Sequence, residues 1–199
     1  MTFAMISAIV LAAGKAKRMG APKLFLALHG KPLLQWSLES VLATEVIEVI
    51  CVVRDLTAAH ANISVADDRL AWLVNERADA GQSSSIISGL WAIDPKADAA
   101  LFVVGDQPML SSQLINALFD RFNRVSAPII APIFQGQVRN PALFRREIFP
   151  ELLKLEGDRG ERAVIEKYQD RLELVQWNEE APFMDIDDQK DYERIKLLA

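Results

Sequence analysis

The chain has 199 residues, of which 51% are hydrophobic, and a formal net charge of −5 at pH 7. It is long enough to bury the core of one α/β domain, and its mixed charges argue against broad binding to nucleic acid or to an anionic membrane surface. No apolar run approaches the ~20 residues that span a bilayer, and residues 1–11 lack the basic flank and cleavage site of a secretion signal. We therefore expect a cytoplasmic protein, in which the lone Cys51 can form neither an internal disulfide nor a cysteine-rich metal site.

Strand and helix patterns alternate through the first two thirds of the chain. Residues 7–14, "SAIVLAAG", form an apolar run that ends at a glycine and predict a buried strand. Residues 31–44 have the apolar spacing of a helix, and residues 45–54 predict a second buried strand. The expected elements that follow are a strand at 71–76, a helix at 83–93, a strand at 98–108, a serine-capped helix at 111–122 and a strand at 127–134. This alternation predicts a mostly parallel sheet with helices on both faces.

The last third of the chain has a different pattern. Residues 136–168 predict two short helices around the polar turn "GDRG", and residues 172–177 predict a late strand. Residues 185–198 predict an amphipathic helix that begins with acidic residues, which suit a helix N-terminus. Because no linker composition or internal repeat interrupts the sequence, we expect residues 1–199 to form a single domain.

A basic, glycine-containing stretch follows the first predicted strand. It runs from residue 10 to residue 23, "VLAAGKAKRMGAPK", where Gly14 and Gly20 permit close approach of the backbone to a ligand. Its cationic side chains are Lys15, Lys17, Arg18 and Lys23. Exposed backbone N–H groups beside such charges suit an oligophosphate, although the spacing matches neither a Walker loop nor a dinucleotide-binding fingerprint. A solvated basic loop is the alternative.

Two acidic stretches complement these cations. Asp106 in "VVGDQP" comes directly after an apolar strand, where a carboxylate suits Mg²⁺, which takes one or two carboxylates and completes its shell with phosphate and water. Asp185 and Asp187 in "MDIDD" point the same way if the segment is extended, whereas the alternative is a cluster that caps the last helix. Together with the basic stretch, these carboxylates are typical of metal-dependent phosphoryl or nucleotidyl transfer.

Several ordered blocks resemble one known family. "LAAGKAKRMGAPK" followed by "LHGKPLLQWSLESVL" resembles the nucleotidyltransferases of molybdenum-cofactor maturation, which carry a MobA-like NTP transferase domain. "GQSSSIISGL", "VVGDQP", "LEGDRGERAVI" and "DIDDQKDYERI" are similar, in the same order, to blocks of the cytidylyltransferase branch. The resemblance implies a Rossmann-like three-layer α/β sandwich like that of nucleotide-diphospho-sugar transferases. It also implies Mg²⁺-dependent transfer of CMP from CTP to molybdopterin with release of pyrophosphate, and a molybdoenzyme as the partner that receives the product.

The resemblance also assigns residues by position. The implied catalytic residues are Arg18, Lys23 and Asp106. The implied nucleotide-binding residues are Leu11, Ala12, Ala13, Gly14, Arg18, Lys23, Gly81, Ser83, Ser85 and Asp106. The implied metal ligands are Asp106 and Asp187, with Asp185 as the substitute for Asp187. The implied acceptor-binding residues are Asn140, Gly157, Asp158 and Arg162.

Departures from the family pattern leave alternatives open. Residues 14–18, "GKAKR", resemble the guanylyltransferase branch, whereas the pair Ala12 and Ala13 resembles the cytidylyltransferase branch, so GTP is the alternative donor. Residues 139–141, "RNP", stand where the branch often has Gly-His-Pro, which leaves a sugar or polyol phosphate as an alternative acceptor. A cofactor-binding chaperone without catalysis is a third interpretation, which Asp106 and Lys23 disfavour.

Overall fold

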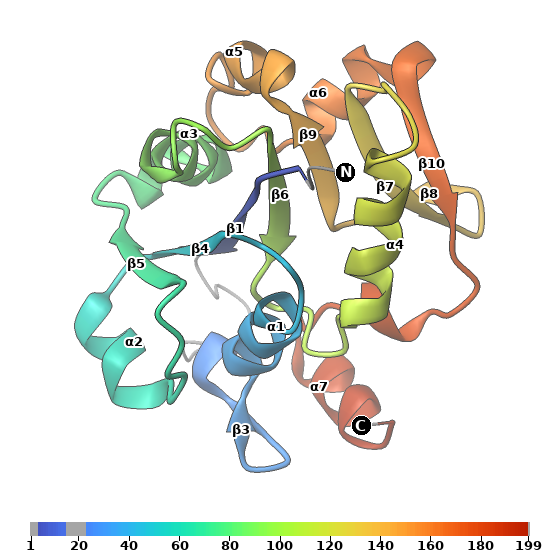
Figure 1. The fold of residues 1–199 in the computed structure, drawn as a ribbon. Coiled ribbons are helices and arrows are strands. Elements are labelled where there is room, and N and C mark those ends of the chain that lie inside the picture. The colour runs from blue at the N-terminus through green and yellow to red at the C-terminus, as the bar shows by residue number, and fades with distance from the viewer. Residues whose placement is uncertain (1–3, 15–22, 199) are drawn as a thin grey trace.

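The computed structural model describes residues 4–14 and 23–198, which are built around one eight-stranded sheet (Figure 1). The strands of this sheet are β1 (Ile6–Ala12), β4 (Glu48–Val53), β5 (Leu70–Val74), β6 (Ala99–Val104), β7 (Ile129–Phe134), β8 (Gln137–Val138), β9 (Ala142–Arg145) and β10 (Leu172–Gln176). Their order is β10-β7-β9-β6-β1-β4-β5, with β8 paired to β7. A separate antiparallel pair consists of β2 (Ala27–Leu28) and β3 (Lys31–Pro32).

Parallel pairing dominates the sheet. Strand β1 lies between β4 and β6 and is parallel to both, β4 is parallel to β5, and β7 is parallel to β10. Only β8 and β9 pair in the antiparallel sense within the described part of this sheet, and β9 joins β6 to β7. Leu11 is in register with Val52 on one side and with Val104 on the other, so the carboxyl ends of the three central strands lie at one edge.

Helices cover both faces of the sheet (Figure 1). The α-helices are α1 (Leu33–Leu42), α2 (Leu56–Asn62), α3 (Gln82–Ala92), α4 (Ser112–Phe122), α5 (Phe149–Leu152), α6 (Arg162–Lys167) and α7 (Gln189–Lys196). The short 3₁₀ helices are η1 (Lys23–Phe25), η2 (Ala78–Ala80), η3 (Arg146–Ile148), η4 (Gln169–Arg171) and η5 (Ala181–Phe183). Helices α1, α2 and α4 pack on one face, and α3, α5 and α6 pack on the other. The predicted mostly parallel, three-layer α/β arrangement is therefore confirmed.

The continuously apolar strands explain this double cover. In β1, Ala8 and Val10 face the core under α1 and α4, whereas Ile9 faces the core under α3, and all three side chains are fully buried. Helix α3 comes very close to β1, because a Cβ added to Gly89 would lie 2.5 Å from Cγ2 of Ile9. A strand that is apolar on both faces can be stable only between two helical layers, as the sequence pattern predicts.

Two elements differ from the expectation. Helix α2 was not expected between 54 and 71; the side chain of Asp55 caps it by accepting a hydrogen bond from the backbone N–H of Ala58 at 3.0 Å. Strand β9 lies within 136–168, where we expected only two short helices around "GDRG". Helices α5 and α6 do flank that turn, but the four residues of β9 owe their conformation to pairing with β6 and β7 rather than to a local pattern.

In the ranges that the structure describes, no helix has both the length and the apolar character required to cross a membrane.

The last helix has a well-formed N-terminal cap. The side chain of Asp188 accepts hydrogen bonds from the backbone N–H groups of Lys190 and Asp191, and the side chain of Asp191 accepts from the backbone of Asp188. Asp191 also accepts a hydrogen bond at 3.0 Å from the backbone N–H of Asp187, so this capping box fixes the chain that precedes α7.

We predict that Asp188→Ala lowers the free energy of unfolding by about 1 kcal/mol, because two helix N–H donors lose their acceptor. Asp188→Thr serves as the matched variant and should retain most of the stability, since a hydroxyl oxygen can cap as well. Urea denaturation followed by circular dichroism measures both. Equal stability of the alanine variant and the wild type would contradict the role of the cap.

Candidate active site

Three segments that are distant in sequence meet beyond the carboxyl ends of β1 and β6. The backbone N–H of Gly105, directly after β6, donates to the carbonyl of Leu11 in β1 at 3.0 Å. The backbone N–H of Ile186 donates to the carbonyl of Asp106 at 3.2 Å. These two bonds place the chain before α7 against the loop after β6. In open parallel sheets, this edge is where ligands bind.

The side chain of Lys23 connects these segments. Its Nζ atom lies 2.7 Å from Oδ2 of Asp106 and 2.8 Å from Oδ1 of Asp187. Lys23 begins η1, and only 14% of its side chain is exposed, while the side chain of Asp106 is 23% exposed. The structure therefore brings together three residues that the sequence predicts for the site, from positions 83 and 164 residues apart along the chain.

Charge is unevenly distributed in this cluster. Burial lowers the pKa of the Lys23 ammonium, but the charges and hydrogen bonds of Asp106 and Asp187 outweigh this effect, and the pKa is raised overall. For Asp185, desolvation raises the pKa, and the neighbouring charges of Asp106 and Asp187 raise it further. Three carboxylates thus share the field of one ammonium, which favours the binding of a further cation.

The carboxylates fit a site with few protein ligands. One carboxylate oxygen of Asp106 and one of Asp187 contact the same ammonium group, that of Lys23, so these oxygens converge on one point. Among the described residues, no group of three or more histidine, cysteine, aspartate or glutamate side chains could hold a metal ion. The two carboxylates could hold a divalent cation that takes its remaining ligands from water and substrate phosphate.

A cavity of about 450 Å³, here called the first cavity, opens beside the ends of β1 and β6. The residues of its lining that the sequence predicts for the site are Leu11, Ala13, Gly14, Gly81, Ser85, Asp106 and Asp158. Most of the predicted nucleotide-binding residues are therefore gathered around one space. Asp158, expected on the acceptor side, also contributes to this lining.

Other predicted residues lie elsewhere. The side chain of Ala12 is buried in the core under α1, and Ser83 donates its hydroxyl hydrogen to the carbonyl of Gly157 at 2.8 Å. Arg18 lies outside the described residues, as do Lys15 and Lys17. The structure therefore gives no position for the cation that we expect to share the role of Lys23.

Sequence reasoning missed two charged residues of the first cavity. Arg54 follows β4 directly and donates hydrogen bonds to Asp79 and, at 3.2 Å, to the carbonyl of Ala13. Asp79 belongs to η2 and also lines the cavity. Arg54 could have been predicted for the site from its position immediately after a buried strand, because the carboxyl ends of neighbouring parallel strands lie at the same edge of the sheet.

The turn before α3 packs against the "GDRG" turn. Gly81 has φ +102°, and a Cβ added there would lie 2.2 Å from the carbonyl oxygen of Gly157. The backbone N–H and the hydroxyl of Ser83 both donate to this same carbonyl. Asn75 fixes the helix start from the other side by donating to the hydroxyls of Ser84 and Ser85. The two turns therefore form one wall of the site, joined by hydrogen bonds and close backbone packing.

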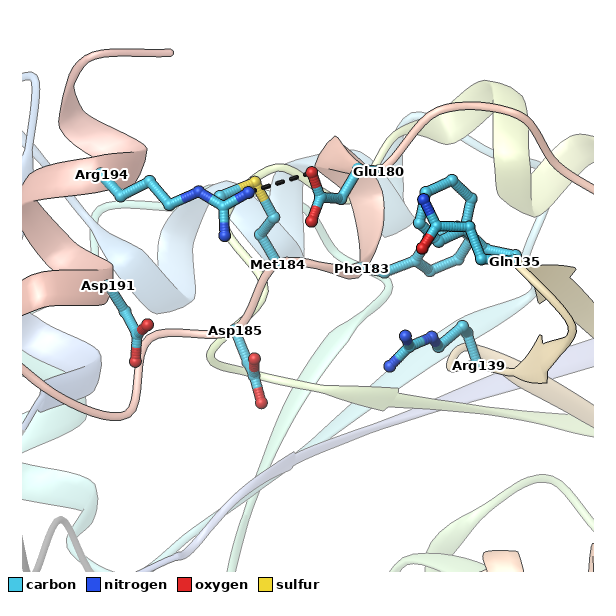
Figure 2. A pocket seen from close by; sticks show the side chains of 9 residues that line it. Gln135, Arg139, Glu180, Phe183, Met184, Asp185, Asp191 and Arg194 are labelled. Carbon is cyan, nitrogen blue, oxygen red and sulfur yellow. Dashed lines mark hydrogen bonds and ion pairs between the residues drawn. The ribbon is translucent and has the colours of Figure 1, made fainter.

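A second cavity, of about 860 Å³, lies on the other side of this wall. Asn140, Asp158 and Arg162, which the sequence predicts for acceptor binding, all line it. Gln82 and Asp158 line both the first and the second cavity, so the two spaces adjoin. A small cavity of about 190 Å³ shares Arg139, Phe183 and Asp185 with the second cavity, and Figure 2 shows Arg139 and Asp185 extending into it from different segments.

Comparisons with known sequences agree with this geometry. The profile of the MobA-like NTP transferase domain matches residues 8–172. The purine catabolism protein PucB of Bacillus subtilis is 29% identical over 198 residues, which cover 94% of each chain. A probable molybdenum cofactor guanylyltransferase of Methanosarcina acetivorans is 31% identical over 163 residues, covering 77% of this chain and 70% of that protein.

Comparisons with solved structures support the fold. The crystal structure of Rv0371c from Mycobacterium tuberculosis superposes with a TM-score of 0.86 at 25% identity, covering 98% of this chain and all of that chain. The same protein in complex with manganese gives a TM-score of 0.82 at 22% identity, with the same coverage. The fold is that of the nucleotide-diphospho-sugar transferases, as the resemblance implied.

We predict that Gly81→Ala lowers the free energy of unfolding by about 2 kcal/mol or more, because the backbone conformation disfavours a side chain and the new Cβ would overlap the Gly157 carbonyl. Gly30→Ala is the matched control, since Gly30 has φ +80° but no atom within 4 Å of an added Cβ. Urea denaturation of both variants isolates the contact between the two turns. Equal losses would show that only backbone strain matters.

Proposed function

The chain belongs to the MobA-like NTP transferase family and is a nucleotidyltransferase, and we propose that it transfers CMP from CTP to molybdopterin with release of pyrophosphate. The observation that carries this proposal is the contact of Lys23 with both Asp106 and Asp187 at the edge of the first cavity. A protein that only binds a nucleotide would not require two carboxylates and an ammonium beside the cavity that Asp106 lines. Metal-dependent transfer requires such groups around the phosphates.

Each group has a distinct part in this reaction. Asp106 and Asp187 would hold Mg²⁺, which when bound would neutralise charge on the triphosphate. The backbone around Ala13 and Gly14 would bind the nucleotide in the first cavity, and Lys23 and Arg18 would compensate the phosphate charge. The acceptor in the second cavity would present its terminal phosphate, whose oxygen forms a bond to the α-phosphorus as the bond to the leaving pyrophosphate breaks. No protein nucleophile is needed, because positioning and charge compensation lower the barrier.

Ala13 supports CTP as the donor. Its side chain is buried and lines the first cavity, and the carbonyl of the same residue is held by Arg54. Members of the guanylyltransferase branch usually carry glycine at this position, so the methyl group of Ala13 removes space where the base would lie. A pyrimidine needs less of that space than a purine does.

GTP is the alternative donor, because the Methanosarcina relative is named as a probable molybdenum cofactor guanylyltransferase. The manganese complex of Rv0371c supports a divalent cation at a site of this fold, and we propose Mg²⁺ for this chain. We further propose that residues 1–199 act as a single domain on small-molecule substrates in the cytoplasm, and that a molybdoenzyme receives the product.

A pyrophosphate-release assay tests this function. Purified protein is incubated with Mg²⁺, molybdopterin and one of CTP, GTP, ATP or UTP, and we expect the highest kcat/KM with CTP. Asp106→Asn should lower kcat at least about 100-fold, because a charge that acts on the reacting phosphates is lost. Asp187→Asn should have a larger effect than Asp185→Asn, since only Asp187 shares Lys23 with Asp106.

Circular dichroism and thermal melting verify that these variants remain folded. Higher activity with GTP than with CTP would identify GTP as the donor and would leave the proposed nucleotidyl transfer unchanged. Release of pyrophosphate that persisted in folded Asp106→Asn would contradict the metal assignment, and turnover with a polyol phosphate but not with molybdopterin would change the acceptor.

We predict that Ala13→Gly raises the GTP:CTP ratio of kcat/KM about tenfold, because one methyl group at a pocket wall discriminates by roughly this amount. Ala12→Gly is the control, since the Ala12 side chain lies in the core rather than in the first cavity. Competition assays with mixed nucleotides measure the ratio directly. An unchanged ratio in Ala13→Gly would show that this methyl group does not choose the base.

A further inference from the structure

The second cavity contains buried polar groups without a protein partner. Within the described residues, Oε2 of Glu161, Oε1 of Gln107 and Nε of Arg139 make no hydrogen bond, and all three residues line this cavity. Glu161 is only 3% exposed and Gln107 is 7% exposed. The cavity therefore offers two hydrogen-bond acceptors and one donor, fixed in place by the surrounding fold.

Glu161 is the most unusual of these groups. A buried carboxyl group with an unsatisfied oxygen is costly, since the lost hydration is not replaced. Glu161 directly precedes α6, yet its side chain makes no capping hydrogen bond there. Desolvation raises the pKa of Glu161, although hydrogen bonds from its own backbone and from Asn140 oppose the shift. A ligand that donates hydrogen bonds to the carboxyl group would relieve this cost.

The location of Glu161 identifies the kind of ligand. The second cavity adjoins the first through Gln82 and Asp158, so a molecule bound there lies next to the nucleotide. It is therefore the acceptor in the reaction proposed above, and the present inference rests on that function. An acceptor that matches these atoms provides two hydrogen-bond donors for Glu161 and Gln107 and an oxygen for Arg139.

We propose that Glu161 is a specificity-determining residue that recognises the pterin ring of the acceptor. Oε2 of Glu161 accepts a hydrogen bond from the 2-amino group, Oε1 of Gln107 accepts one from the ring N3–H, and Nε of Arg139 donates one to the 4-oxo oxygen. The 2-amino-4-oxo edge of a pterin has two neighbouring donors and one acceptor, which matches the unpartnered atoms of the cavity. Sugar and polyol phosphates have no such edge.

Binding of free pterin tests the proposal without catalysis. Pterin and lumazine differ at position 2, where lumazine has an oxo group in place of the amino group, and the fluorescence of each compound reports its binding. We expect the wild-type protein to bind pterin at least about tenfold more tightly than lumazine, because the oxo group would face the Glu161 carboxyl group. Glu161→Gln should weaken pterin binding about tenfold and remove the preference.

Glu166→Gln is the matched control. Glu166 lines the same cavity, but its side chain is 72% exposed, so removing its charge should leave the preference for pterin unchanged. Thermal melting separates unfolding from loss of recognition, and we expect Glu161→Gln to be at least as stable as the wild type, because the buried carboxyl group is poorly satisfied. The variant should also raise KM for molybdopterin in the transfer assay without changing KM for CTP.

The outcomes distinguish this inference from the proposed function. Equal affinity of the wild type for pterin and lumazine, absence of pterin binding, or an intact preference in folded Glu161→Gln would each overturn the role of Glu161. None of these results would exclude nucleotidyl transfer to molybdopterin. Failure of the proposed function would instead appear in the wild-type protein, as pyrophosphate release that does not depend on molybdopterin.

Discussion

The contact of the Lys23 ammonium with Asp106 and Asp187 is the interaction on which the site depends. Carboxylates brought this close would repel one another and resist desolvation without a cation between them. Lys23, in the segment after β1, supplies that cation. The two carboxylates come from the loop after β6, which contains Asp106, and from the chain before α7, which contains Asp187. Because a half-buried charge that loses its partner is strongly destabilising, each of these three segments constrains the other two.

Local sequence pattern was sufficient for much of this arrangement. The apolar runs of β1, β4 and β6 predict buried parallel strands, and a parallel sheet brings its carboxyl ends to one edge. Asp106 could thus be placed at the site from its position directly after a strand. Its relation to Asp187 could not be derived from spacing, since a backbone hydrogen bond from Ile186 to Asp106 joins segments that are 80 residues apart. The family resemblance supplied that pairing instead.

Features that depend on tertiary contacts could not be predicted in the same way. Residues 142–145 form strand β9 because they pair with β6 and β7. In the sequence, Glu161 is one of several charged residues beside a polar turn, and nothing there indicates its burial. Its burial results from the packing of several segments around the second cavity. The close approach of Gly81 to Gly157 is likewise a contact between two turns. The glycine in each turn predicts a flexible backbone there, but it does not predict which segment the turn contacts.

The wall between the cavities separates the two binding spaces of the proposed reaction. Gln82 and Asp158 line both cavities, while Ala13 lines the first cavity and Glu161 lines the second. In the reaction proposed above, donor selection would depend on the volume beside a strand end, whereas acceptor selection would depend on hydrogen bonding in a buried polar space. A substitution at one cavity would then change one substrate while leaving the contact of Lys23 with Asp106 and Asp187 in place. A fold with this division can retain its chemistry while its nucleotide and its acceptor change separately.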